Sequence, residues 1–200
     1  MRLLPSHQQA LECFREAGGI LRTTQAQKRG VHPRTLYQLL ELGRLERLSR
    51  GVYRLAELPP LADPDLVAVA ARVPKAVVCL ISALHVHGLT TDIPHEVSIA
   101  LPPRTKRPEI DYPPIRVFWF SGNSFTEGVE KHAPDGVRIY SATKTVADCF
   151  KFRNKLGIDV AVEALRTGLE EDLVRPAELL RYARVCRVER VMKPYLEAIL

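Results

Sequence analysis

Hydrophobic positions recur at helical spacing in three segments near the start of the chain. Over residues 6–17 they form one stripe, and the two glycines that follow end the helix. A short second helix is predicted over residues 23–30, between two threonines that can cap its start and a glycine that can end it. A third helix is predicted over residues 33–43, because a proline opens it and Leu36, Leu39 and Leu40 share one face.

Two β-prone runs follow over residues 44–55, separated by the turn-forming sequence Ser49–Arg50–Gly51, and they predict a β-hairpin. Helix, short helix, tight turn, helix and hairpin occur in the order of a winged helix-turn-helix. In that motif the second helix of the helix-turn-helix enters the major groove of DNA. Residues 1–57 are therefore predicted to form a winged helix-turn-helix DNA-binding domain.

A change in composition separates this domain from the rest of the chain. Residues 58–64 contain three prolines and no periodic pattern, so residues 58–63 are predicted to be a linker. Asp63 stands at the N-cap of an apolar helix that ends at Arg72, and this helix is expected to open a second domain over residues 64–200.

The second domain is predicted to combine strands and helices. Strands are expected over residues 76–80, 97–101, 115–120, 129–132 and 137–140. Helices are expected over residues 82–87, 141–154, 158–168 and 176–200. The predicted fold class is α+β, with an N-terminal winged helix-turn-helix followed by a mixed α/β domain that has a helical C-terminus.

Composition excludes several classes of protein. Hydrophobic residues make up 46% of the chain and charged residues 26%, which excludes disorder throughout. No apolar run reaches the roughly 18 residues that a membrane span needs, so we expect a cytoplasmic protein without membrane contact. The cysteines, at positions 13, 79, 149 and 186, are too dispersed for a zinc module and are expected to be reduced thiols. No metal and no cofactor is expected.

The net charge of +6 is unevenly distributed. Residues 1–57 hold ten Lys/Arg against five Asp/Glu, a net of +5, whereas the remaining residues hold nineteen against eighteen, a net of +1. This asymmetry favours a basic head that contacts a polyanion, although a solvated basic surface would have the same composition.

The third predicted helix carries side chains that can read bases. With its leucines facing inward, the outward or flanking positions are Arg34, Thr35, Tyr37 and Gln38. Arginine pairs with guanine and glutamine with adenine in the major groove, and threonine can contact either polar edges or a thymine methyl. These four residues are the candidate base-reading set, although any exposed helix can show such residues.

Basic residues surround this helix and recur near the C-terminus. The candidate wing and backbone contacts, where cations can neutralise phosphates, are Lys28, Arg44, Arg47, Arg50 and Arg54. A possible second basic patch, spaced by three residues along the helix predicted over 176–200, consists of Arg181, Arg184, Arg187 and Arg190. The alternative for this second patch is a solvated helix face.

The sequence contains no nucleotide-binding or nucleophile motif, so no catalytic residue is assigned and no enzyme is expected. Asp148 is expected to form a salt bridge along its helix, and the pair His85 and His87 is expected to be buried or capping. An enzyme that processes nucleic acid remains a less favoured alternative, and its candidate carboxylates are Glu96, Glu109, Asp111 and Asp148.

The stretch from Gly18 to Leu55 resembles the N-terminal winged helix of AbiEi-family antitoxins from type IV toxin–antitoxin systems, most characteristically in its RGVYRL run. The segments LISALHVHGLT, PHEVSIALPP, PIRVFWF and GVRIYSATKTVADCF resemble, in that order, the family's C-terminal antitoxin domain. The resemblance extends from Leu11 to about Gly168. His32 departs from it, because such helices usually carry Ser or Thr at the cap, and a weaker cap is expected.

The resemblance implies a repressor of its own operon that binds inverted repeats in operator DNA. It also implies a second domain that opposes a nucleotidyltransferase-type toxin without forming a stable complex with it. The resemblance assigns the recognition-helix positions to Arg34, Thr35, Tyr37 and Gln38, and the wing positions to Arg47, Arg50 and Arg54. We expect a monomer in solution. A stand-alone winged-helix regulator whose second domain senses a small ligand remains an alternative.

Overall fold

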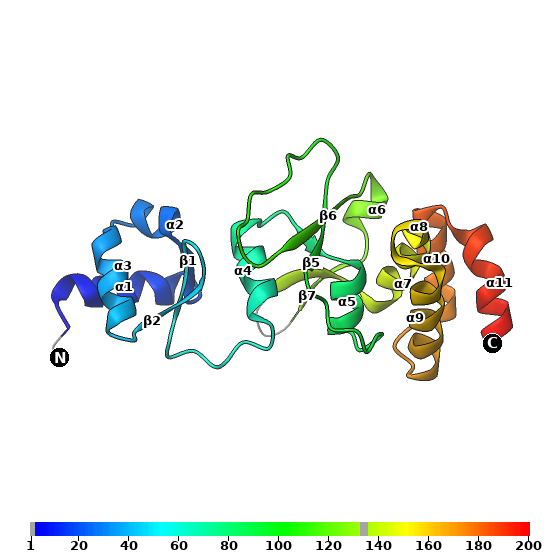
Figure 1. Ribbon diagram of the computed structural model, residues 1–200, viewed down its shortest axis with the longest axis horizontal. Coiled ribbons are helices and arrows are strands. Elements are labelled where there is room, and N and C mark those ends of the chain that lie inside the picture. The colour runs from blue at the N-terminus through cyan, green and yellow to red at the C-terminus, as the bar shows by residue number, and fades with distance from the viewer. Residues whose placement is uncertain (1–2, 133–135) are drawn as a thin grey trace. The chain divides into compact units, whose positions relative to one another are not determined.

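The computed structural model describes residues 3–132 and 136–200. They divide into two compact units (Figure 1). The first unit comprises the chain up to Pro74 together with Ile110–Pro113, and the second comprises Lys75–Glu109 and Pro114–Leu200.

Three helices and three strands at the start of the first unit have the order of a winged helix. In chain order the elements are α1 (Pro5–Glu16), β1 (Ile20–Arg22), α2 (Thr23–Lys28), α3 (Pro33–Glu41), β2 (Leu45–Ser49), β3 (Val52–Leu55) and α4 (Pro64–Arg72). The strands form an antiparallel sheet in the order β1-β3-β2. The predicted helices and hairpin are confirmed, and strand β1 is an addition that its short apolar run did not signal.

The core of the winged helix lies between α1, α3 and one face of the sheet. Phe14 of α1 and Leu36 and Leu39 of α3 are fully buried, as their helical spacing predicts. Tyr53 and Leu55 of β3 join the same core. Burial of each large apolar side chain contributes roughly 1.5–3 kcal/mol, so these contacts fix the orientation of α3.

Helix α4 packs on the same three-stranded sheet. Asp63 caps it, since the Leu66 N–H lies 3.0 Å from Oδ1 of Asp63. At its other end Nη1 of Arg22 donates to the Arg72 carbonyl, and Arg72 donates to the Arg50 carbonyl. The predicted boundaries placed this helix in the second domain, whereas its contacts group it with the first unit. Whether residues 1–57 and 64–200 act as separate domains stays a prediction.

The second unit is built on a mixed five-stranded sheet in the order β6-β5-β4-β8-β7. Its elements are β4 (Val77–Val78), α5 (Leu80–Val86), β5 (Val97–Leu101), β6 (Ile115–Trp119), α6 (Asn123–Thr126), β7 (Val129–His132), β8 (Val137–Tyr140), α7 (Ala142–Lys151), α8 (Arg153–Leu156), α9 (Ile158–Glu170), α10 (Pro176–Cys186) and α11 (Glu189–Ile199). Neighbours β5 and β6, and β4 and β8, run parallel. The predicted α+β class with a helical C-terminus is confirmed.

Helix α7 is the buried centre of this unit and holds an internal ion pair. It packs against α5, α9 and α10. The Nζ of Lys144 lies 2.7 and 2.6 Å from the two carboxylate oxygens of Asp148, and both side chains have no exposed surface. Cys186 of α10 donates its thiol to Oδ1 of Asp148 at 3.1 Å, and the Lys144 ammonium lies 4.3 Å from the Tyr140 ring centroid. The salt bridge expected along the helix is present and is fully buried.

The C-terminal segment is two helices rather than the single helix predicted over 176–200. Helix α10 ends at Cys186, where Arg187 adopts the left-handed conformation (φ 60°, ψ 41°). The Val188 N–H then donates to the Ala183 carbonyl at 2.8 Å, which closes the end of α10. No glycine or proline marks this break, so the periodic pattern alone could not place it.

Candidate nucleic-acid interface

Helix α3, the candidate recognition helix, begins with a side-chain cap. Nδ1 of His32 accepts a hydrogen bond from the Arg34 N–H at 3.2 Å, and Pro33 occupies the first turn. The imidazole therefore does what a Ser or Thr hydroxyl would do at this position. We expected His32 to be a weaker cap than Ser or Thr, and the structure shows that it does cap the helix.

Arg34 and Tyr37 face outward from α3, and 57% of the Tyr37 side chain is exposed. Thr35 was assigned to the same set but is only 9% exposed. The reason is helical geometry, because Thr35 lies roughly 40° from Leu39 around the helix axis and so borders the buried face. Thr35 is therefore not available to a base edge in this structure.

Gln38 is half-buried and already has a partner. Its Oε1 lies 3.1 Å from Nε2 of His7, a buried residue of α1. Because the amide oxygen can only accept, the imidazole must donate this bond. The amide nitrogen of Gln38 is left for other contacts, and a bidentate contact with adenine would have to share the oxygen with His7.

The hairpin that forms the wing is short, and its tip is tied to the rest of the unit. The tip residues are Arg50 and Gly51, and Gly51 has a φ of 74° that favours glycine. The Gly51 carbonyl accepts from the Thr23 N–H at 2.9 Å. This bond places the wing tip beside the start of α2, so the helix-turn-helix and the wing form one surface.

Arg47 and Arg50 of the wing are exposed. Nη1 of Arg50 lies 3.2 Å from Oδ2 of Asp111, with 78% and 72% of the two side chains exposed. A pair this exposed contributes little free energy, so a phosphate can displace the carboxylate.

Arg54 does not belong to the interface. It lies on the central strand β3, is 3% exposed, and pairs with Glu46 at 3.2 Å. It also donates to the Pro59 carbonyl. Side chains alternate between the two faces of a strand, so Arg54 lies on the face opposite the core residues Tyr53 and Leu55. On that face its guanidinium is paired with Glu46. Its role is structural.

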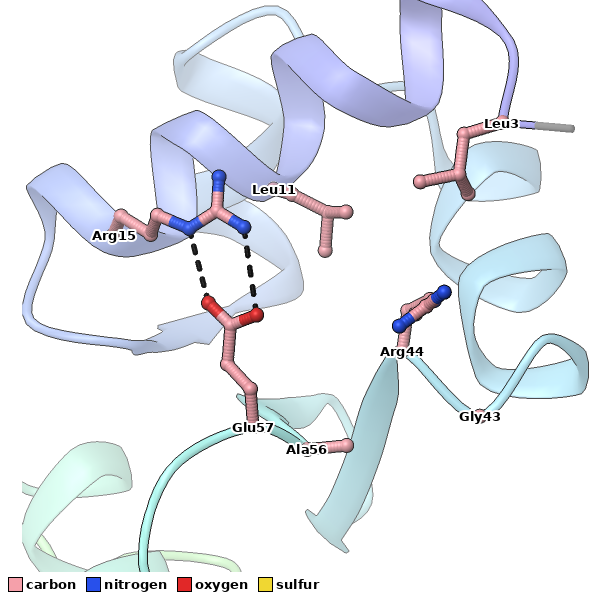
Figure 2. Close-up of a pocket in the computed structure, with 7 residues that line it drawn as sticks. All are labelled: Leu3, Leu11, Arg15, Gly43, Arg44, Ala56 and Glu57. Carbon is pink, nitrogen blue, oxygen red and sulfur yellow. Dashed lines mark hydrogen bonds and ion pairs between the residues drawn. The ribbon is translucent and has the colours of Figure 1, made fainter.

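Arg44 lies at the base of the hairpin, not at its tip. Figure 2 shows it with Leu11 and Gly43 in a pocket of about 300 Å³. In the same pocket Nε of Arg15 lies 3.0 Å from Oε1 of Glu57, a contact that lowers the pKa of the Glu57 carboxyl. Because the Glu57 carboxylate already lies in the same pocket as Arg44, Arg44 is the weakest candidate for a phosphate contact.

Four exposed cations of the helix-turn-helix and its wing form what we call the head surface: Lys28 and Arg29 at the end of α2, Arg34 on α3 and Arg47 on β2. Across residues 3–132 and 136–200, no ion pair is present for any of their side chains. Exposed, unpaired cations on a helix-turn-helix and its wing are suited to phosphate contacts, because they gain free energy when counterions are released from DNA.

The predicted second basic patch is divided between two helices and partly neutralised. Arg181 pairs with Glu127 at 3.3 Å and with Glu178 at 3.6 Å, and Arg184 pairs with Glu189 at 3.2 Å. Arg187 caps α10, and Arg190 is exposed on α11. The four arginines therefore do not form the single stripe expected along one helix. Because two of them are already paired with carboxylates, they are weak candidates for phosphate contacts.

The carboxylates considered for an enzyme have separate partners. Glu96 lies near Arg116 at 3.7 Å, Glu109 near Lys106 at 2.9 Å, and Asp148 is buried against Lys144. Within the part of the chain that the structure describes, no three His, Cys, Asp or Glu residues are placed to hold a metal ion.

The two neighbouring histidines bond to backbone carbonyls. His85 Nδ1 lies 3.1 Å from the Asp92 carbonyl, and His87 Nε2 lies 2.7 Å from that of Tyr140. Burial lowers the pKa of the His87 imidazole. Each contact occupies one nitrogen of its imidazole.

Residues 8–56 match a family model described as transcriptional regulator, AbiEi antitoxin. The winged-helix segment is therefore similar to AbiEi antitoxin regulators. This match confirms the resemblance found in the sequence, and the family supports a DNA-binding regulator or antitoxin of a toxin–antitoxin system and is generally non-enzymatic. The match ends before the second unit, whose likeness to the AbiEi antitoxin domain stays a prediction.

The whole chain is similar in fold to the RV2827C protein from Mycobacterium tuberculosis, whose crystal structure has been determined. The TM-score is 0.52 at 15% sequence identity, over 98% of this chain and 82% of that one. Identity this low supports the shared fold alone. No curated protein sequence matches this chain. None of the helices described is long and apolar enough to cross a membrane.

Proposed function

We propose that the protein is a sequence-specific DNA-binding repressor and the antitoxin of a type IV toxin–antitoxin system, and that it regulates its own operon. The observation that carries this proposal is the head surface of unpaired cations on a winged helix of the AbiEi type. The proposed DNA site is an operator with inverted repeats, which two copies of the chain would occupy as half-sites.

The residues divide into two groups by what they can contact. Arg34 and Tyr37 are the proposed base-reading residues, and Gln38 contributes its free amide nitrogen. The proposed phosphate contacts are Lys28, Arg29, Arg47 and Arg50. Phosphate contacts set affinity and position, whereas base contacts set specificity, so the two groups are separable by experiment.

The second unit is proposed to oppose a nucleotidyltransferase-type toxin without binding it stably. The near-neutral charge beyond residue 57 supports a role that needs no tight contact with DNA. The candidate toxin for a test is the product of the neighbouring gene.

The binding test uses DNA from upstream of the protein's own gene. With four phosphate contacts per copy, the affinity is expected to fall about 100-fold between 50 and 200 mM salt, because log K falls with a slope of about −0.9 per phosphate neutralised. Arg47→Gln should weaken binding and flatten this slope. The matched control is Arg15→Gln, since Arg15 is already paired with Glu57. An affinity that barely responds to salt would contradict the proposal.

Repression and antitoxicity are expected to separate between the two units. Residues 1–74 should bind operator DNA, and residues 75–200 should protect cells from the toxin encoded beside the gene. A fragment of residues 1–57 is the comparison, and we expect it to be less stable because it lacks α4 and the bond from Arg22 to the Arg72 carbonyl. If a folded, expressed second unit failed to protect, the separation would be wrong.

A further inference from the structure

The second unit contains a basic cavity that the proposed function does not use. It has a volume of about 570 Å³, which lies in the range of small-molecule sites. The polar or charged residues that line it are Ser121, Asn123, Ser124, Lys151, Cys186 and Arg187. All of the lining residues lie in the described part of the chain, and they include two cations, Lys151 and Arg187, and no carboxylate.

Lys151 is positioned for an anion by its surroundings. Its Nζ donates to the Ser124 hydroxyl at 2.7 Å and lies 5.5 Å from the Phe120 ring centroid. An ammonium group has three N–H donors, so the bond to Ser124 fixes the group and leaves donors for a ligand. Because the side chain is half-buried, its attraction for an anion is screened less than that of an exposed lysine.

Arg187, an exposed residue, lines the same cavity and lies at the break between α10 and α11. No ion pair is present for its guanidinium in the described chain. Its backbone is left-handed (φ 60°), a conformation that usually selects glycine at the end of a helix. Arginine is strained in this conformation and glycine is not, so the presence of arginine suggests that its side chain has a function at this position.

The floor of the cavity does not cancel these two charges. The Cys186 thiol donates to Asp148, and burial raises the pKa of Cys186 to about 12, so the thiol stays neutral. Beneath it the Asp148 carboxylate is balanced by Lys144. The lining therefore keeps the two positive charges of Lys151 and Arg187.

We propose that this cavity binds the phosphate group of a small phosphorylated ligand of about nucleotide size. Lys151 and Arg187 supply the charge, and the hydroxyl of Ser121 and the amide of Asn123 supply hydrogen bonds. A phosphate dianion would neutralise the two cations, and the volume leaves room for the group that carries the phosphate.

The test is a titration of the full-length, ¹⁵N-labelled protein, followed by nuclear magnetic resonance. The probes are inorganic phosphate, AMP, ATP and, as the phosphate-free control, adenosine. Phosphate and both nucleotides should give saturable shifts at the amides of Ser121, Asn123 and Arg187, and adenosine should give none. If AMP binds more tightly than inorganic phosphate, the nucleoside also contacts the cavity. If the two affinities are equal, the site recognises the phosphate group alone.

Two variants and one control locate the site. Arg187→Asn removes the charge but keeps a residue that tolerates the left-handed backbone, and it should weaken AMP binding at least tenfold. Lys151→Gln should do the same. Arg190→Asn removes a neighbouring exposed arginine outside the cavity and should leave binding unchanged. Thermal unfolding checks that each variant is folded.

Three results would overturn the proposal. They are the absence of saturable shifts with every phosphate-bearing probe, an equal loss of binding in Arg190→Asn, and competition by adenosine as strong as that by AMP. A duplex DNA of random sequence is added as a last probe. If it shifts the same amides and no small phosphate does, the cavity is a contact for the DNA backbone instead. None of these readouts needs the operator, so they fail or succeed independently of the proposed repressor role.

Discussion

Replacing Lys144 by methionine is expected to lower the free energy of unfolding of the second unit by about 3–5 kcal/mol, the usual cost of removing one partner from a buried ion pair. Lys144 and Asp148 are both fully buried, and the ammonium group contacts both carboxylate oxygens. Among the residues that the structure describes, the substitution leaves the Cys186 thiol as the one close donor to the Asp148 carboxylate. Burial already raises the pKa of Asp148, and without Lys144 the group is expected to bind a proton.

The measurement is urea unfolding of the full-length protein. The chain has one tryptophan, and Trp119 lies on β6 of the second unit, so its fluorescence follows that unit. The matched control is the double variant Lys144→Met/Asp148→Leu, which removes both charges together. It should be clearly more stable than Lys144→Met, because apolar groups of similar volume often replace a buried pair without loss. A single variant within about 1 kcal/mol of the parent would show that the pair does not hold the unit together.

Local signals were enough to predict most elements of the fold. The capping and proline signals at Asp63 and Pro33 begin helices in the structure, and the turn around Gly51 closes the hairpin. These features depend on residues near one another in sequence, so a linear pattern records them. The placement of α4 with the first unit depends on Arg22 and Arg72, which are 50 residues apart, and no local pattern records that contact.

The sequence predicted part of the candidate site correctly, and the residues that it assigned wrongly share a common cause. Helical spacing correctly turned Arg34 and Tyr37 outward. Thr35 was wrongly assigned to the outward face, although helical spacing places it beside Leu39 at the border of the apolar face. Arg54 was wrongly assigned to the wing surface, because its strand is covered on both faces. A polar residue type suggests exposure, but the neighbouring elements decide it. The basic cavity was missed because its residues come from separate elements that sequence spacing cannot bring together.

Arg34→Ala is expected to lower the preference of the protein for operator over random DNA by about 1–3 kcal/mol, or roughly 5- to 150-fold, because one good bidentate base contact is worth that much. The measurement is the ratio of the two affinities at one fixed salt concentration. Arg47→Ala is the matched comparison. It removes an exposed wing cation, so it should weaken binding to both DNAs by similar factors and leave the ratio unchanged.

Thr35→Ala separates base reading from packing within the same helix. Because Thr35 is buried beside the core of α3, its truncation should change thermal stability and leave the operator preference as it was. A base-reading Thr35 would instead lower the preference without lowering stability. If Arg34→Ala left the ratio unchanged while Thr35→Ala reduced it, α3 would have to lie in the groove on a different face. In that case the outward surface described by Arg34 and Tyr37 would not be the one that reads DNA.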